Sequence, residues 1–209
     1  MRKARAKTGE CAYCEAVGAL TMDHVPPQCL FLPPRPSDLI TVPSCQPCND
    51  SFKKDDEYFR QVITAGIDPF RFPIALQTIT RLAAPQKAGF RRKMVSDVNF
   101  QDGSLGVDRQ RVDRVASRLI RGLLFHHTEK RMGAGTKIQV WYPCFDDPVP
   151  GDSDLQALLD LVKHERLRTI GDGVFSYRCI TDGSDNQSGV WQMVFYERNE
   201  VVGVVFPYD

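Results

Sequence analysis

Four cysteines in the first quarter of the chain are arranged in two closely spaced pairs. Cys11 and Cys14 form one C-x-x-C motif, and Cys45 and Cys48 form a second one 30 residues later. Each short turn aims two sulfurs at one point, and two such pairs supply the four thiolates of a tetrahedral Zn²⁺ site. The pattern therefore predicts a structural zinc site. Two unrelated turns or a redox pair are the alternatives, although neither motif lies in the βαβ context of a redox protein.

A second group of residues that could take part in a reaction lies between the two cysteine pairs and directly after the second one. Asp23 and His24 are separated from Pro26 and Pro27 by one residue, and Asn49 directly follows Cys48. A histidine has an ordinary pKa of about 6.5 and can act as a general base at neutral pH. Mg²⁺ prefers oxygen ligands and keeps several waters, so one carboxylate and one amide oxygen suffice from the protein. These residue types suit metal-assisted hydrolysis, whereas an isolated Asp-His dipeptide is more often structural.

The order of these features resembles that of the HNH endonucleases. The matching segments are "DHVPP" and "DLITVPSCQPCNDSFKKDDEYF", and the resemblance covers roughly residues 8–60. It implies the ββα-metal, treble-clef-like fold in its four-cysteine zinc-knuckle variant. It also implies hydrolysis of DNA with a catalytic Mg²⁺ or Mn²⁺, leaving 5′-phosphate and 3′-hydroxyl ends. In that case His24 is the general base, and Asp23 and Asn49 are the ligands of the catalytic metal.

Two positions depart from the usual HNH pattern. Asp38 stands where the family usually carries an asparagine that braces the loop bearing the base. An ionised carboxylate accepts hydrogen bonds but cannot donate one, so we expect the bracing to be weaker or reversed in sense. Asn49 stands in place of the final histidine, a substitution that occurs within the family and favours Mg²⁺ or Mn²⁺ over a softer metal.

The prolines after His24 bear on how the site is built. Neighbouring residues of a strand point to opposite sides, so Asp23 and His24 cannot both face one phosphate from a regular strand. We expect Pro26 and Pro27 to end the strand at this point and to leave the pair where the backbone can bend.

The hydrophobic pattern predicts an α+β protein. The proline-containing segment at residues 67–73 is the best candidate for a boundary. It would divide the chain into a nuclease domain with structural zinc at 8–66 and an α+β domain of unknown role at 67–209, helical first and then antiparallel β. The predicted strands are at 39–42, 137–142, 174–181, 189–197 and 201–206, and the predicted helices are at 49–66, 74–84, 107–132 and from 153 onward.

Charge is distributed unevenly along the chain. Residues 1–144 hold 22 Lys and Arg against 14 Asp and Glu, whereas residues 145–209 hold 5 against 12. A basic front part is a mild indication of an anionic ligand, and ordinary surface variation is the alternative. Neither a signal peptide nor an apolar run of about 20 residues is found, so we expect a cytoplasmic protein without a membrane partner.

Several basic residues are candidate nucleic-acid contacts. Lys53 and Lys54 open the predicted helix after Asn49, where free N–H groups favour an anion. Four arginines of the helix at 107–132 lie within one arc of about 80°, opposite its apolar face, and such a stripe can follow a phosphate backbone. A solvated helix face is the alternative in both cases. The four arginines are Arg111, Arg114, Arg118 and Arg121.

The sequence therefore favours an HNH endonuclease that hydrolyses DNA. Two alternatives stay open, namely a zinc-knuckle module that binds nucleic acid without catalysis, and a ribonuclease. Cutting of both strands by a single site per chain would favour a homodimer.

Overall fold

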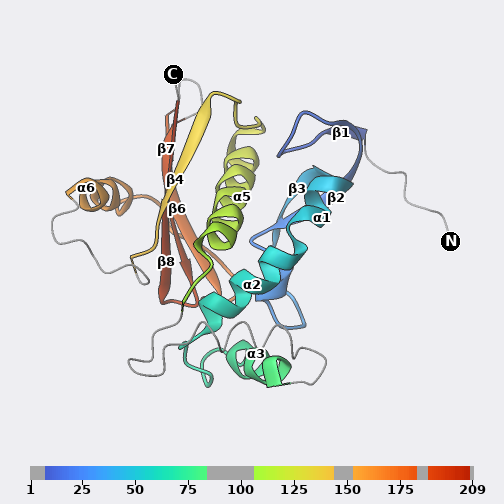
Figure 1. Ribbon diagram of the computed structural model, residues 1–209. Helices are drawn as coiled ribbons and strands as arrows, with labels where there is room; N and C mark the ends of the chain where they lie inside the picture. Colours follow the sequence, from blue (N-terminus) through green and yellow to red (C-terminus); the bar gives the residue numbers. More distant parts are fainter. Residues whose placement is uncertain (1–7, 84–105, 144–152, 183–187, 208–209) are drawn as a thin grey trace.

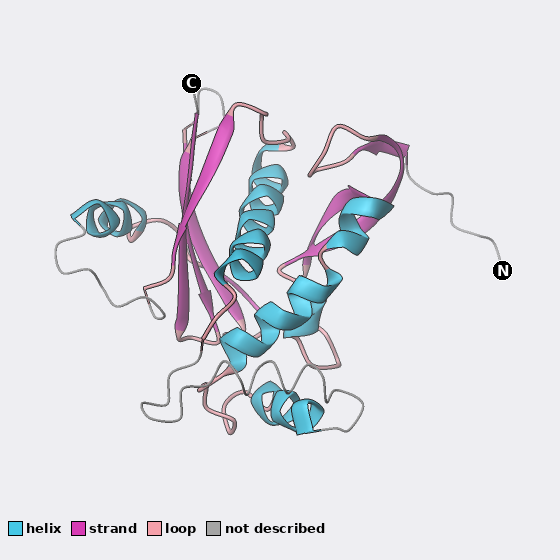
Figure 2. Ribbon diagram, viewed as in Figure 1, coloured by secondary structure: helices cyan, strands magenta, loops and turns pink. Residues whose placement is uncertain are grey.

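The fold is α+β, with a small antiparallel sheet near the N-terminus, then helices, and a larger antiparallel sheet near the C-terminus (Figure 1). It is described by a computed structural model, which covers residues 8–83, 106–143, 153–182 and 188–207. The predicted fold class is confirmed, including the order in which a cysteine-bearing segment precedes helices and a C-terminal β region. Figure 2 shows how these helices and strands alternate in space.

The small sheet carries the sequence motifs. Its antiparallel strands are β1 (Thr8–Glu10), β2 (Val17–Val25) and β3 (Ile40–Cys45), in the order β1-β2-β3. Strand β2 ends immediately before Pro26, as predicted, and a short 3-10 helix (Gln28–Leu30) follows.

Two helices follow the small sheet in place of the single helix predicted at 49–66. They are α1 (Gln46–Ser51) and α2 (Lys53–Thr64), which meet at Phe52. Helix α1 begins before the predicted start because Pro47 lies in its first turn, where a missing N–H is no loss.

The larger sheet is antiparallel, with its strands in the order β4-β8-β7-β6-β5. Side chains alternate between two apolar faces along β7 and β8, so that Trp191 and Val201 belong to the main core and Val190 and Val202 to a smaller cluster. The three-residue strands β1 and β5 have no counterpart among the sequence predictions. The strands are β4 (Thr136–Trp141), β5 (Arg168–Ile170), β6 (Phe175–Thr181), β7 (Gly189–Phe195) and β8 (Asn199–Pro207).

Helix α5 (Arg109–Thr128) forms the layer between the two sheets (Figure 1). It packs on β4 and β8 on one side and on α2, β2 and β3 on the other. Helix α6 (Ser153–Val162) covers the opposite face of the larger sheet, and α3 (Ile74–Ala83) packs against α2. These helices confirm the predictions at 74–84, at 107–132 and from 153 onward.

Two glycines let α5 approach both sheets closely. A Cβ atom on Gly122 of α5 would lie 2.6 Å from Cγ2 of Val25 in β2, and a Cβ atom on Gly203 of β8 would collide with Ile120 of α5. Protein interiors are too densely packed to absorb such overlaps without movement. A side chain at either position would therefore force Val25, Ile120 or α5 itself to move.

One hydrophobic core runs through both parts of the chain. It extends from Ala12 in the cysteine-bearing segment to Val205 in the last strand. The predicted boundary is also bridged by hydrogen bonds, since Asn199 donates to the Ile63 carbonyl and the Tyr196 hydroxyl donates to the Leu30 carbonyl. The two-domain division stays a prediction about folding units, but the two parts share their interior.

No helix within the described residues is both long enough and apolar enough to cross a membrane.

Candidate functional site

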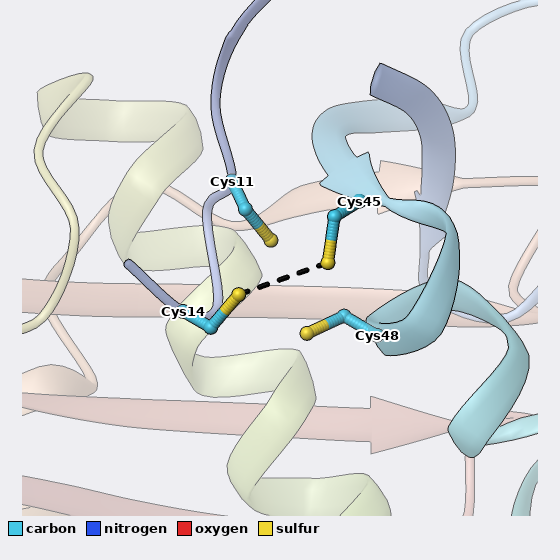
Figure 3. A group of neighbouring side chains, drawn as sticks. All are labelled: Cys11, Cys14, Cys45 and Cys48. Atoms are coloured by element: carbon cyan, nitrogen blue, oxygen red, sulfur yellow. Dashed lines mark hydrogen bonds between the residues drawn. The ribbon is translucent and has the colours of Figure 1, made fainter. Parts of the chain in front are cut away.

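The four cysteines of the two C-x-x-C motifs converge on one point (Figure 3). Cys11 and Cys14 lie in the turn between β1 and β2, Cys45 ends β3, and Cys48 lies in α1. Their four sulfur atoms all lie within 4.8 Å of one another, and the Sγ atoms of Cys14 and Cys45 are 3.7 Å apart. Tetrahedral zinc with Zn–S bonds of about 2.3 Å requires sulfurs about 3.8 Å apart. The cluster therefore fits a metal ion such as zinc.

Hydrogen bonds from the backbone favour the thiolate form of one cysteine of the cluster. Burial alone would raise the pKa of the Cys11 thiol, but hydrogen bonds with backbone groups of Cys45, Tyr13 and Cys14 outweigh it and bring the pKa to about 7. Burial and the neighbouring thiols raise the pKa of Cys48 instead. One thiolate thus forms readily, while four together require a positive ion. Because all four ligands come from the protein, the site is closed, as structural zinc sites are.

Asp23 lies in β2, opposite Val42 of β3, and its side chain points inward to α5. Its Oδ2 atom accepts a hydrogen bond of 2.7 Å from the Tyr13 hydroxyl and lies 3.5 Å from Nη1 of Arg118. Burial and the charge of Asp23 raise the pKa of Tyr13, so the phenol stays protonated and donates. The carboxylate predicted to bind a metal therefore has two protein partners.

His24 is the next residue of β2 and lies opposite Thr41, so its side chain points to the other face of the strand. The prediction that the Asp-His pair lies where the backbone bends is wrong, because the β2–β3 ladder includes both residues. Burial lowers the pKa of His24 below its ordinary value, with the Asp23 carboxylate opposing the shift. Nε2 of Gln28 lies 3.4 Å from Nε2 of His24. An amide nitrogen only donates, so in this contact the lone pair of His24 Nε2 points to Gln28.

Asn49 packs against the same strand from the start of the helical segment. Its Nδ2 atom donates to the Thr21 hydroxyl over 2.8 Å and lies 3.5 Å from the Met22 carbonyl oxygen. Thr21 donates its own proton to the Ser44 carbonyl, so its oxygen must accept from Asn49. This contact fixes the amide and leaves Oδ1 as the available oxygen. Thr21 and Asp23 are two residues apart, so Asn49 and Asp23 lie on the same face of β2.

Asp23 and Asn49 carry oxygen atoms of the type that hard cations prefer. Within the described residues, Asp23 contacts Tyr13 and Arg118 through Oδ2, and Asn49 contacts Thr21 and Met22 through Nδ2. One carboxylate oxygen and one amide oxygen thus stay available, the combination that suits Mg²⁺. Asp38, the position that departs from the HNH pattern, is exposed in the turn before β3 and has no hydrogen bond or ion pair within the described part of the chain.

The four arginines of α5 do not form a single exposed stripe, which corrects the sequence-based expectation. The Arg118 side chain is only 1% exposed, and its Nη2 lies 2.6 Å from the Asp56 carboxylate. Arg111 is 19% exposed and pairs with Asp55 at 2.7 Å. Their guanidinium groups hold α5 to α2, which leaves Arg114 and Arg121 as the candidates that reach solvent. The lysines at the start of α2 are exposed, and Lys53 pairs with Asp50 at 2.5 Å.

An open pocket of about 490 Å³ lies beside Arg118. The aromatic ring of Phe52 and the side chains of Arg114, Arg118 and Arg121 contribute to its lining. Arg114 is 53% exposed although it pairs with Asp55 at 2.9 Å. Arg121 has no ion pair within the described residues, and its Nε atom has no hydrogen-bond partner there. The lining also includes Asp113, so the pocket carries a net positive charge, and it is linked to Asp23 only through Arg118.

Sequence reasoning missed three residues that shape the site. Tyr13 and Thr21 orient Asp23 and Asn49, and Asp56 holds Arg118. The position of Tyr13 inside a C-x-x-C turn was the only available signal, because a residue between two metal ligands is fixed in space. The contacts of Thr21 and Asp56 depend on strand and helix packing that the pattern does not encode.

Comparison of the chain with protein-family models, curated proteins and solved structures finds no match. The established result is therefore a four-cysteine cluster in an α+β fold, able to bind a metal ion such as zinc.

Proposed function

We propose that this chain is a metal-dependent endonuclease of the HNH type that hydrolyses phosphodiester bonds in DNA. The observation that carries the proposal is the packing of Asn49 against β2, on the same face as Asp23 and directly after the cysteine cluster. Three residues that the sequence resemblance selects, Asp23, His24 and Asn49, thereby belong to one small structural unit.

In this proposal each residue has one task. Asp23 and Asn49 would hold Mg²⁺ or Mn²⁺ through one oxygen each, and the bound cation would stabilise the charge that develops on the phosphate. His24 would accept a proton from the attacking water. Its lowered pKa keeps the imidazole neutral near pH 7, which is the form a general base requires.

Nucleic-acid binding is supported by the basic pocket that Arg114, Arg118 and Arg121 line. Arg114 and Arg121 would contact phosphates there. Lys53 and Lys54 are further exposed candidates at the start of α2.

A second candidate function, nucleic-acid binding without catalysis, is favoured by the state of Asp23. The side chain is only 8% exposed and already has Arg118 as a counterion. In addition, Asp23 and His24 point to opposite faces of β2. A chain that uses Asp23 only to hold α5 in place would bind nucleic acid but not cut it.

Cleavage assays on defined substrates separate these functions. The full-length, zinc-loaded protein is incubated with supercoiled, nicked, linear, branched and single-stranded DNA and with RNA, in Mg²⁺, in Mn²⁺ or with EDTA at a concentration that leaves zinc bound. The proposal expects cleavage of DNA only when the divalent ion is present. Binding without cleavage on every substrate would establish the second candidate, and cleavage of RNA alone would make the chain a ribonuclease.

A further inference from the structure

Tyr13 connects the cysteine cluster with Asp23. It is the third residue of the turn Cys11-Ala12-Tyr13-Cys14, and its backbone N–H donates to Sγ of Cys11 at 3.4 Å. Its hydroxyl, at the other end of the side chain, donates to Oδ2 of Asp23 at 2.7 Å. A single residue therefore spans from a ligand of the cysteine cluster to the candidate metal-binding carboxylate.

The Tyr13 ring is held between two other elements. The ring of Phe52, at the junction of α1 and α2, meets it edge to face with centroids 6.0 Å apart. On the side of α5, a Cβ atom placed on Gly122 would lie 3.2 Å from the Tyr13 hydroxyl oxygen, so the helix backbone closes this side. These contacts leave the hydroxyl little freedom, and its hydrogen bond to Asp23 has a fixed direction.

Arg118 acts on the same carboxylate oxygen from another direction. Its Nη1 lies 3.5 Å from Oδ2 of Asp23, its Nη2 lies 2.6 Å from Oδ1 of Asp56, and its guanidinium lies over the Phe52 ring at 4.6 Å. A buried carboxylate requires a partner of opposite charge. Arg118, which lies on α5 outside the cysteine-bearing segment, is that partner for both Asp23 and Asp56. Because both partners use Oδ2, the other oxygen of Asp23 has no partner within the described residues.

We propose that Tyr13 is a positioning residue, which fixes the Asp23 carboxylate through Oδ2 so that Oδ1 is presented to a divalent cation. This inference rests on the proposed function, because it takes Asp23 as a ligand of the catalytic metal. It gives the cysteine cluster a task beyond stability, since the metal-bound turn fixes the backbone from which Tyr13 extends. It also gives α5 a role in the site, because α5 closes the space around the Tyr13 hydroxyl and its Arg118 is the counterion of Asp23.

Tyr13→Phe tests the inference, because it removes one oxygen atom and keeps the ring contact with Phe52. Tyr196→Phe is the matched control, since Tyr196 is also buried and its hydroxyl also donates one hydrogen bond of 2.8 Å, to the Leu30 carbonyl. Binding of Mn²⁺ to the zinc-loaded proteins is measured by the loss of the electron paramagnetic resonance signal of free Mn²⁺. Asp23→Asn serves as the variant in which the site itself is damaged.

We expect Tyr13→Phe to raise the Kd for Mn²⁺ by about 10- to 100-fold, the usual effect of removing a hydrogen-bond partner of a metal ligand. Zinc content and melting temperature should match those of Tyr196→Phe, whose Kd for Mn²⁺ should equal that of the wild type. The Mg²⁺ concentration for half-maximal cleavage should rise by the same factor, while the rate at saturating Mg²⁺ stays near that of the wild type.

The outcomes separate this inference from the proposed function. If Tyr13→Phe binds Mn²⁺ as tightly as the wild type, while Asp23→Asn does not, the positioning role is wrong and the metal site stands. If the zinc-loaded wild type binds no Mn²⁺ that depends on Asp23, both the metal site and the positioning role are wrong. A shift in Kd for Tyr13→Phe in a chain that cuts no substrate would support the positioning role and contradict only the nuclease activity.

Discussion

The cysteine-bearing sheet and the five-stranded sheet are stabilised by different interactions. In β2 only Asp23 and Val25 are buried, and Asp23 is charged. In β8 the buried residues include Val201, Val202 and Val205, and packed helices cover both faces of that sheet. The larger sheet is therefore stabilised by apolar burial, whereas the small sheet depends on the cysteine cluster and on ion pairs with α5. The part with the candidate chemistry is therefore also the part whose strands bury fewer apolar side chains.

The largest expected effect is that of losing the cysteine cluster. Cys45→Ser should abolish zinc binding and unfold the small sheet, because structural zinc contributes on the order of 10–16 kcal/mol to the folding of such modules. Elemental analysis and hydrogen exchange of the two sheets are the measurements. Cys179→Ser, a half-buried cysteine of β6 outside the cluster, is the control and should keep its zinc. A folded wild-type protein that holds no zinc would contradict the prediction.

A cavity in the core of the larger sheet should lower stability without the loss of zinc expected for Cys45→Ser. Phe175 is fully buried, and its ring packs against Tyr177 and Phe195 with centroids 5.5 and 5.0 Å apart. Phe175→Ala should lower the free energy of unfolding by about 3–5 kcal/mol. Denaturant titration measures this loss, and the remaining folded protein should still contain stoichiometric zinc. Loss of zinc together with stability would show that the two parts of the chain do not differ as proposed.

The larger sheet should also respond to acid through His127. Its ring nitrogen Nε2 lies 3.0 Å from the Tyr177 hydroxyl, and burial, with Arg168 and His126 nearby, lowers its pKa to about 4. The unfolded chain binds this proton near pH 6.5, and the folded chain does not. Stability should therefore be complete above pH 6.5 and should fall as the pH drops from about 6.5 to 4.

His127→Gln keeps a hydrogen-bonding side chain but cannot titrate, so it should flatten this part of the stability curve. The measurement is the free energy of unfolding against pH for the two proteins. Curves that stay parallel between pH 4 and 6.5 would show that the proton on His127 makes no difference to stability.

Smaller changes are expected at the basic pocket, where only binding is affected. Arg121→Gln should weaken binding of duplex DNA and reduce the slope of log K against log salt by about 1, as for one lost phosphate contact. The control is Arg166→Gln, an exposed arginine after α6. Fluorescence anisotropy at several salt concentrations, with Ca²⁺ in place of Mg²⁺, gives both slopes. Equal slopes for the two variants would exclude Arg121 from the interface.

The sequence predicted local structure better than the packing of α5. Apolar periodicity located the helix at 107–132, but a helical pattern does not tell which neighbour covers the remaining surface. The arginines opposite the apolar face were therefore interpreted as an exposed stripe, whereas Arg111 and Arg118 pair with Asp55 and Asp56 of α2. The convergence of the cysteines was predictable because C-x-x-C turns are local. The contact between Tyr13 and Asp23 requires the β1–β2 turn, β2 and α5 together, so spacing alone does not reveal it.

The most direct test of the central claim is the cleavage rate of His24→Ala at saturating Mg²⁺. The variant should keep its zinc and its affinity for DNA. Its melting temperature should change no more than a typical surface substitution changes it, because His24 lies on the outer face of β2. His164→Ala, an exposed histidine after α6, is the control. We expect His24→Ala to lose cleavage by a factor of roughly 10²–10⁴, with partial recovery in added imidazole or at higher pH. Cleavage by His24→Ala at nearly the wild-type rate would contradict the account, because the hydrolysis would then not depend on His24.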